Sequence, residues 1–220
     1  MQPLIFTDWG IIDYEQALAK QEELFNDKIQ QKSLGKKPSN DFIICTHTPV
    51  YTLGRHGKET NMLLSSDRLD HIGVRLLRVS RGGDITFHGL GQIVGYPIID
   101  LEQFGLGIKQ YIWTIEEMII QTLAQYHIQG ERLEGATGVW LEPNTHNARK
   151  ICAIGVRASR YVTMHGFALN VSTDLKYFSY INPCGFQNKG VTSMEKEIGR
   201  KISLDEVKEV IKEKAIKLFK

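Results

Sequence analysis

A cysteine in a turn is the first residue of this sequence that could do chemistry. Cys184 lies in Tyr180–Phe186, YINPCGF, between a proline and a glycine. These neighbours are typical of a turn, where a thiol has little to pack against and its sulfur can be reached. Cys45, inside the strand-like FIICTHT, instead has the pattern of a small buried apolar residue. We therefore interpret Cys184 as the candidate nucleophile.

A cysteine nucleophile needs a cationic or basic partner, because a thiol with a pKa of about 8.5 is mostly protonated at neutral pH. The candidates are His88, His165 and Lys150, each in a strand or loop segment that ends in small residues. Sequence spacing alone does not choose among them. Lys150 begins an apolar strand pattern, KICAIGV, where a charged group must face either the rim of a site or a pocket.

Metal binding is the alternative use of a cysteine. The sequence has no CxxC pair, and Cys45 with His47 has strand spacing but falls short of a zinc ligand set. We therefore expect neither a metal nor another cofactor.

A glycine-rich stretch, Arg81–Gln92 with the sequence RGGDITFHGLGQ, is a candidate binding loop. Two glycines beside an arginine let backbone N–H groups approach a ligand, and the guanidinium can hold an anionic or carbonyl oxygen. An ordinary hairpin connection is the alternative interpretation. The stretch lacks the glycine and lysine spacing of a Walker loop or a Rossmann fingerprint, so it does not indicate a nucleotide.

The composition of the chain indicates its size class, its partners and its cellular compartment. The chain has 220 residues, 42% of them hydrophobic, which suits a full-sized core, and we expect residues 1–220 to form a single catalytic domain. A net charge of +2 gives no basic excess that would point to nucleic acid or a membrane surface. Three cysteines, no signal-peptide pattern and no span-length apolar run predict a cytoplasmic protein.

Three amphipathic helices are predicted. The first begins after a cap at Asp13 and ends before Gly35. The second has apolar residues at intervals of three and four from Ile108 to Tyr126. The third begins at Ser203, with Glu206 as the partner in a capping box.

Segments rich in β-branched and aromatic residues lie between these helices. Strands and helices are segregated rather than alternating, which predicts an α+β fold with a mixed or antiparallel sheet flanked by helices. The strand-like segments are DFIICTHTPV, VRLLRVS, QIVGYPIIDL, GVWLE, KICAIGVRAS and YVTMHGFALNV.

Four motifs, taken in order, resemble those of the lipoyl(octanoyl) transferases, the octanoyltransferases of lipoate biosynthesis. They are TPVYTLGRHGKETNMLL, RGGDITFHGLGQ, KICAIGVRASRYVTMHGFALNV and INPCGF, and they span roughly Thr48 to Ser193. The resemblance implies a fold like that of the biotin and lipoate protein ligases, in agreement with the α+β prediction from the residues.

The resemblance also implies a chemistry. Cys184 would take an octanoyl group from octanoyl-acyl carrier protein as a thioester and pass it to a lysine of a lipoyl domain, in a 2-oxoacid dehydrogenase E2 subunit or the glycine cleavage H protein. Lys150 would lower the pKa of this cysteine and move protons. The acyl pocket implied by the family comprises Arg81, Gly82, Gly83, Asp84, Ile85, Thr86, Phe87, His88, Ala153, Ile154, Gly155, Gly166, Phe167 and Ala168.

Two residues depart from the family's pattern. Leu90 stands where a proline is usual, which loosens the turn after His88 without removing a functional group. Cys152 replaces a small apolar residue, and strand alternation predicts that it faces the same side as Lys150, as a second thiol near the site.

Three other functions are weighed against this one. An ATP-dependent lipoate or biotin protein ligase shares the fold but needs no cysteine nucleophile. A transferase that moves octanoyl groups between lipoyl domains has its nucleophile elsewhere in the chain. A non-catalytic acyl-binding or carrier-binding module would not need Cys184 and Lys150.

Because carrier proteins are acidic, we also expect a basic patch at the pocket mouth, with Arg149, Arg157 and Arg160 as candidates.

Overall fold

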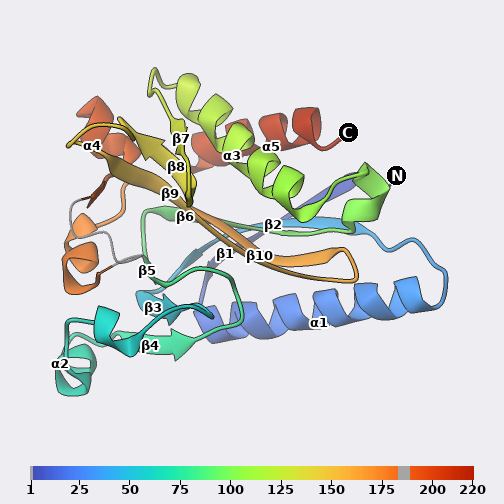
Figure 1. Cartoon of the computed structure of the whole chain (residues 1–220), viewed down its shortest axis with the longest axis horizontal. Helices are drawn as coiled ribbons and strands as arrows, with labels where there is room; N and C mark the ends of the chain where they lie inside the picture. The colour runs from blue at the N-terminus through green and yellow to red at the C-terminus, as the bar shows by residue number, and fades with distance from the viewer. Residues whose placement is uncertain (1, 183–188) are drawn as a thin grey trace.

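The computed structural model describes residues 2–182 and 189–220, and Cys184 lies outside this part of the chain. Within the described residues the chain forms two sheets and five α-helices (Figure 1). Among the described residues, no helix has the length and apolar character needed to cross a lipid bilayer.

The larger sheet is mixed. Among the described residues it has eight strands in the order β1-β2-β6-β10-β9-β8-β7, with β11 paired to β9 outside this path. The pairs β1–β2 and β11–β9 are parallel and the other pairs are antiparallel. The strands are β1 (Leu4–Ile12), β2 (Asn40–His47), β6 (Gln92–Ile98), β7 (Glu131–Leu133), β8 (Ala136–Leu141), β9 (Arg149–Ser159), β10 (Val162–Asn170) and β11 (Gly190–Val191).

The smaller sheet has the order β4-β3-β5, with β3 parallel to β4 and antiparallel to β5. Its strands are β3 (Val50–Leu53), β4 (Arg75–Arg78) and β5 (Ile85–His88), and the short helix α2 (Ser66–His71) contacts β4. This sheet buries its own apolar cluster, which includes Tyr51, Leu53 and Phe87. The turn before β5 donates a hydrogen bond from Gly82 to Val156 of β9, so the stretch Arg81–His88 lies where the two sheets meet.

The long helices cover opposite faces of the larger sheet (Figure 1). Helix α1 (Tyr14–Ser33) lies against β6 and β10, while α3 (Ile108–Ala124) and α5 (Leu204–Leu218) pack together on the other face. A short helix, α4 (Met194–Ile198), precedes α5. Apolar residues fill both interfaces, with Phe25, Ile43 and Ile98 on the α1 side and Ile115, Met118 and Ile211 on the α3 side.

The helices predicted from the sequence are confirmed, and their caps explain where they start. Asp13 accepts hydrogen bonds from the first-turn N–H groups of Glu15 and Gln16, and Ser203 accepts one from the N–H of Glu206. The mixed sheet is also confirmed. Strand β1 was not among the predicted segments, because as an edge strand it exposes alternate apolar residues such as Ile5 and Ile11.

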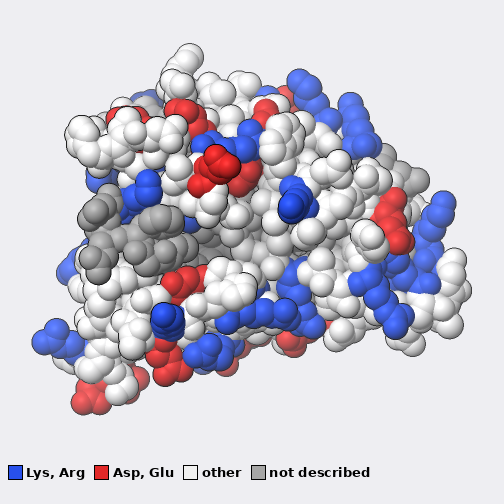
Figure 2. All heavy atoms as spheres, viewed as in Figure 1, with Lys and Arg blue, Asp and Glu red and all other residues white. Residues whose placement is uncertain are grey.

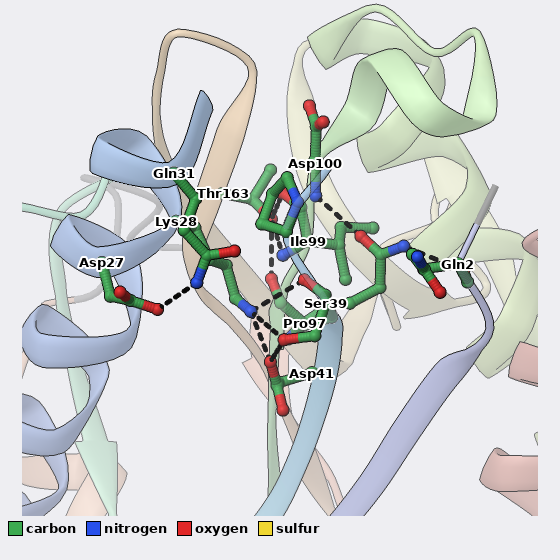
Figure 3. A network of polar contacts seen from close by, with 12 residues as sticks. Gln2, Asp27, Lys28, Gln31, Ser39, Asp41, Pro97, Ile99, Asp100 and Thr163 are labelled. Carbon is green, nitrogen blue, oxygen red and sulfur yellow. Dashed lines mark hydrogen bonds and ion pairs between the residues drawn. The ribbon is translucent and has the colours of Figure 1, made fainter. Parts of the chain in front are cut away.

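A buried ion pair fixes helix α1 to the sheet (Figure 3). The Lys28 side chain has 2% of its area exposed, and its ammonium contacts the carboxylate of Asp41. It also donates to the carbonyl of Ser39 at 2.7 Å and to the Ser39 hydroxyl at 2.8 Å. All three donors of the ammonium therefore have acceptors, as a buried charge requires.

We expect Lys28→Met to lower the free energy of unfolding by about 3 kcal/mol, because it leaves the Asp41 carboxylate without its buried partner. Chemical denaturation measures this change. The matched control is Lys20→Met, an exposed lysine of the same helix, which should change stability by less than about 1 kcal/mol. Equal effects of the two substitutions would contradict the role given to the buried pair.

Candidate active site

A cavity of about 440 Å³ lies where the two sheets meet. It is bounded by the turn before β5 and by the middle of β9 and β10. Most of the residues that the sequence nominated for an acyl pocket come together here. They are Arg81, Gly82, Gly83, Asp84, Ile85, Thr86, His88, Ala153, Ile154, Gly155, Gly166, Phe167 and Ala168.

Phe87 does not line this cavity. Its side chain points into the core of the smaller sheet, where its ring stacks on Tyr177 with 4.4 Å between ring centroids. Alternation along β5 places Thr86 and His88 on the cavity side and Phe87 on the other face, while Ile85, at the start of the strand, both borders the cavity and packs in that core.

The turn at Arg81–Gly83 is held from both sides. The Arg81 guanidinium donates to the carbonyl of Thr52 at 2.7 Å and to its hydroxyl at 2.8 Å. The N–H of Gly82 donates to the carbonyl of Val156 at 3.0 Å. A Cβ added to Gly155 would lie 2.8 Å from the carbonyl oxygen of Gly82, so only glycine permits this contact between turn and strand. Backbone therefore forms this wall of the cavity.

A chain of buried polar groups connects the turn to the far side of the cavity. The His88 ring nitrogen Nδ1 lies 2.8 Å from Oε1 of Gln92, whose amide donates to Asn170 at 2.9 Å. Because the Gln92 oxygen is the acceptor, His88 carries its proton on Nδ1. The amide of Asn170 then donates to the carbonyl of Thr192 at 3.0 Å, just beyond β11.

Burial keeps the two histidines of the cavity neutral. It lowers the pKa of His88 well below its usual range, helped by the nearby charge of Arg81. Burial, with Arg81 and Arg157 nearby, lowers the pKa of His165 to about 3. A neutral imidazole supplies no positive charge for a thiolate.

Lys150 lies on β9 and lines the cavity with a half-buried side chain. Its ammonium donates to the carbonyl of Thr137 at 3.2 Å and sits 4.7 Å from the centroid of the Trp140 ring. The strand carrying Thr137 is held by Glu116 of α3, whose carboxylate accepts the N–H of Gly138 at 3.0 Å. Gly138 has a φ of 125°, which only glycine adopts without strain.

The described residues on either side of the cysteine turn are anchored at this cavity. Before the turn, the N–H of Asn182 donates to the carbonyl of Asn61 at 2.8 Å, and the Asn61 amide donates to the carboxylate of Asp84 at 2.6 Å. After the turn, β11 pairs with the start of β9, and the N–H of Thr192 donates to the carbonyl of Lys150 at 3.0 Å. Cys184 itself lies outside the described residues.

Comparison with known proteins identifies the family. Residues 13–216 match the lipoyl protein ligase A/B catalytic domain. The octanoyltransferase of Bacteroides fragilis is 57% identical over 205 residues, which cover 93% of each chain. That of Cytophaga hutchinsonii is 47% identical and covers 98% of this chain and 92% of its own.

The chain belongs to the octanoyltransferase family. It is therefore an acyltransferase, as the four motifs implied, and the interpretations as a ligase or a non-catalytic module are not favoured.

Solved structures agree with the fold of this octanoyltransferase. The bipartite lipoate protein ligase of Thermoplasma acidophilum superposes with a TM-score of 0.71 at 15% identity, over 99% of this chain and 83% of its own. A biotin protein ligase from Aquifex aeolicus gives a TM-score of 0.51 at 11% identity, over 99% of this chain and 68% of its own. The ligase-like fold expected from the sequence is thus confirmed.

Cys152 does not line the octanoyltransferase cavity, in contrast to the expectation from strand alternation. Val139 pairs with Cys152, but the next residue, Trp140, pairs with Lys150. A bulge therefore adds a residue to β9 between them and breaks the two-residue alternation. Cys152 is fully buried in the core beneath α3, and burial raises the pKa of its thiol far above the ordinary value.

We expect iodoacetamide to leave Cys45 and Cys152 unmodified in the folded octanoyltransferase at neutral pH. Burial raises the pKa of both thiols, so thiolate is scarce, and neither sulfur is exposed. Peptide mapping by mass spectrometry measures the result, with the urea-unfolded protein as the control in which both cysteines react. Rapid labelling of Cys152 in the folded protein would contradict its placement in the core.

Several residues of the octanoyltransferase site were not found from the sequence. Tyr14 of α1, Tyr96 of β6, Trp140 of β8 and Lys189, just before β11, also line the cavity. Tyr14 read as part of an amphipathic helix and Trp140 as part of a strand. The sequence around each of these residues looks like that of an ordinary core residue. They come together only in the folded protein, where α1, β6 and β8 border the same cavity.

Two of the three arginines considered for a basic patch have partners within the protein. Arg149 pairs with Glu142 at 2.7 Å and with Glu197 at 2.6 Å, and Arg157 donates to the Ser80 hydroxyl at 3.2 Å. Arg160 is exposed in the turn between β9 and β10. On the face seen in Figure 2, Lys and Arg side chains are interspersed with Asp and Glu. The expectation of a basic patch stays a prediction.

Proposed function

We propose that this octanoyltransferase carries the octanoyl group as a thioester on Cys184 and that Lys150 moves the protons of both half-reactions. The observation that carries the proposal is the pairing of β11 with β9. It ties the chain directly after the cysteine turn to the backbone of Lys150, beside the cavity. Of the three candidate partners for the thiol, the two histidines are buried and neutral, which favours Lys150 as the cation.

Over one catalytic cycle, Lys150 gives up one proton and takes one back. The Cys184 thiolate attacks the thioester carbonyl of the donor, and the departing thiolate takes a proton from the Lys150 ammonium. An incoming lysine, as a neutral amine, then attacks the acyl-enzyme. Its nitrogen passes one proton to the neutral Lys150, the C–S bond breaks, and the amide leaves behind the original thiolate and ammonium. Thioester exchange is nearly balanced in energy and amide formation is downhill, so no ATP is needed.

The wall between Gly155 and the Arg81–Gly83 turn suits an extended acyl chain. Glycine backbone on both sides leaves a flat surface, and Ile154, Phe167 and Ala168 add apolar area to the same cavity. We assign these residues, with the others of the predicted acyl pocket, to binding the octanoyl group. Phe87 supports the site only indirectly, through the core of the smaller sheet.

The partners follow from this chemistry. The proposed donor is octanoyl-acyl carrier protein. The proposed acceptors are lipoyl domains of 2-oxoacid dehydrogenase E2 subunits and the glycine cleavage H protein, so that the reaction is the first step of endogenous protein lipoylation. Residues 1–220 would act as one catalytic domain.

Intact mass spectrometry tests the proposal. The purified protein is mixed with octanoyl-acyl carrier protein and then with a lipoyl domain. We expect one octanoyl adduct on the enzyme, mapped to Cys184, that disappears as the lipoyl domain gains the same mass. If no adduct forms and the lipoyl domain gains mass only when ATP and free octanoate are supplied, the chain is a ligase and the proposal fails.

A further inference from the structure

Two lysines share one aromatic ring at the Lys150 end of the cavity. The Trp140 indole N–H donates to the carbonyl of Ala136 at 2.9 Å, which fixes the orientation of its buried ring. The ammonium of Lys150 lies 4.7 Å from the ring centroid, and that of Lys189 lies 5.7 Å from it. Both lysines line the cavity. Two positive charges are thus held beside the same ring, where acyl transfer is proposed to occur.

Lys189 has further contacts that keep it beside the site. Its ammonium lies 3.5 Å from the carbonyl oxygen of Pro143, in the loop after β8. The next residue in the chain, Gly190, begins β11, whose partner strand β9 carries Lys150. The two lysines are therefore positioned by the same pair of strands, and Trp140 lies on β8, the neighbour of β9 in the sheet.

Other charges lie on the elements around Lys150, and two clusters among them carry one net negative charge each. Arg132 of β7 pairs with Glu116 at 3.1 Å and with Glu117 at 2.7 Å, and Arg149 of β9 likewise pairs with two carboxylates. These carboxylates favour the Lys150 ammonium, and they do so whichever residue stands at position 189. Across the cavity lie Arg81 and Asp84. Cys152 is neutral, because burial raises its pKa.

We propose that Lys189 is a positioning and tuning residue, a second cation that makes Lys150 release its proton at a lower pH than it otherwise would. This inference rests on the proposed role of Lys150. A like charge destabilises an ammonium relative to the neutral amine, and a lysine beside another cationic group is activated in this way. Lys189 acts through Lys150 and makes no bond to the substrate.

The effect serves both half-reactions. In the first, Lys150 becomes a stronger acid towards the departing donor thiolate. In the second, its neutral form is favoured, and this form accepts the proton from the attacking amine. The attraction of the Trp140 ring for the Lys150 ammonium works in the opposite direction. The Trp140 ring attracts the Lys150 ammonium whether or not residue 189 is charged. Removing the charge of Lys189 therefore reveals the effect of that charge alone.

Discharge of the acyl-enzyme as a function of pH tests the inference. The adduct is formed with octanoyl-acyl carrier protein, separated from the donor, and mixed with excess lipoyl domain of a 2-oxoacid dehydrogenase E2 subunit at a series of pH values. We expect the midpoint of the rate profile in Lys189→Met to move up by about one pH unit. The acceptor lysine contributes the same pH dependence to every variant, so the difference between variants reports on Lys150.

Lys189→Arg is the matched control, because it keeps the charge, and its midpoint should stay within a few tenths of a pH unit of the unsubstituted protein. An unchanged midpoint in Lys189→Met, or the same shift in both variants, would overturn the inference. If Lys189→Met is unstable by thermal denaturation, Lys189→Gln replaces it. Failure of the unsubstituted protein to form an adduct would instead count against the proposed function, so the two failures are distinguishable.

Discussion

Replacing Cys184 with serine is expected to reduce octanoyl transfer by about 10⁴-fold or more, as removal of a covalent nucleophile does in other enzymes. A hydroxyl beside an ammonium stays protonated at neutral pH, whereas a thiol in the same place becomes a thiolate. The transfer rate to a lipoyl domain and the mass of the enzyme are measured together. Both the transfer and the adduct should be lost.

Cys152→Ala is the control for this experiment. It removes a thiol from the core beneath α3, two residues along β9 from Lys150, without touching the cavity. We expect it to keep the adduct and to retain transfer within a few-fold of the unsubstituted protein. An adduct that survives in Cys184→Ser but disappears in Cys152→Ala would show that the wrong cysteine had been assigned.

Lys150→Met is expected to reduce transfer by about 10²- to 10⁴-fold, the range for loss of a general acid–base group. Methionine keeps much of the side-chain length but carries no charge and no proton. Two measurements separate its roles. The rate of iodoacetamide labelling of Cys184 at neutral pH should fall, because the thiolate loses its neighbouring cation. The rate of discharge to a lipoyl domain should fall as well, because the proton acceptor is gone.

Lys150→Arg distinguishes charge from proton transfer. Arginine keeps the positive charge but does not give up its proton in this pH range. We expect labelling of Cys184 to be largely retained and discharge to be lost. If discharge also persists in the arginine variant, Lys150 is not the base. Unchanged labelling in Lys150→Met would remove it from the activation of Cys184.

Much of the fold could be predicted from sequence because its signals are local. The caps at Asp13 and Ser203 and the apolar periodicity of α3 depend only on neighbours within a few residues, and each helix was confirmed. Strand β5 was hidden inside the glycine-rich stretch, which read as a loop, because its pairing with β3 is a long-range contact. Its four residues are flanked by glycine turns, but a run this short gives only a weak strand signal.

The proposed acyl pocket was predicted through a resemblance, whereas the geometry of the cavity depends on contacts between distant segments of the chain. The face to which Cys152 points illustrates this. Alternation along an ideal strand placed it with Lys150, and one bulge opposite Val139 and Trp140 moved it into the core. A bulge arises from the pairing of two strands, so the sequence of β9 alone does not reveal it.

The contact between Gly155 and Gly82 limits how the shape of the proposed acyl slot can be altered. A wall made of backbone has no side chain that could be trimmed to lengthen the slot, and even a methyl group at Gly155 would meet the Gly82 oxygen at 2.8 Å. This side of the slot therefore cannot be reshaped by substituting side chains, and ligand design can treat it as constant. Variants selected for longer or shorter acyl chains should instead carry their changes at cavity residues that have side chains, such as Ile154 and Phe167.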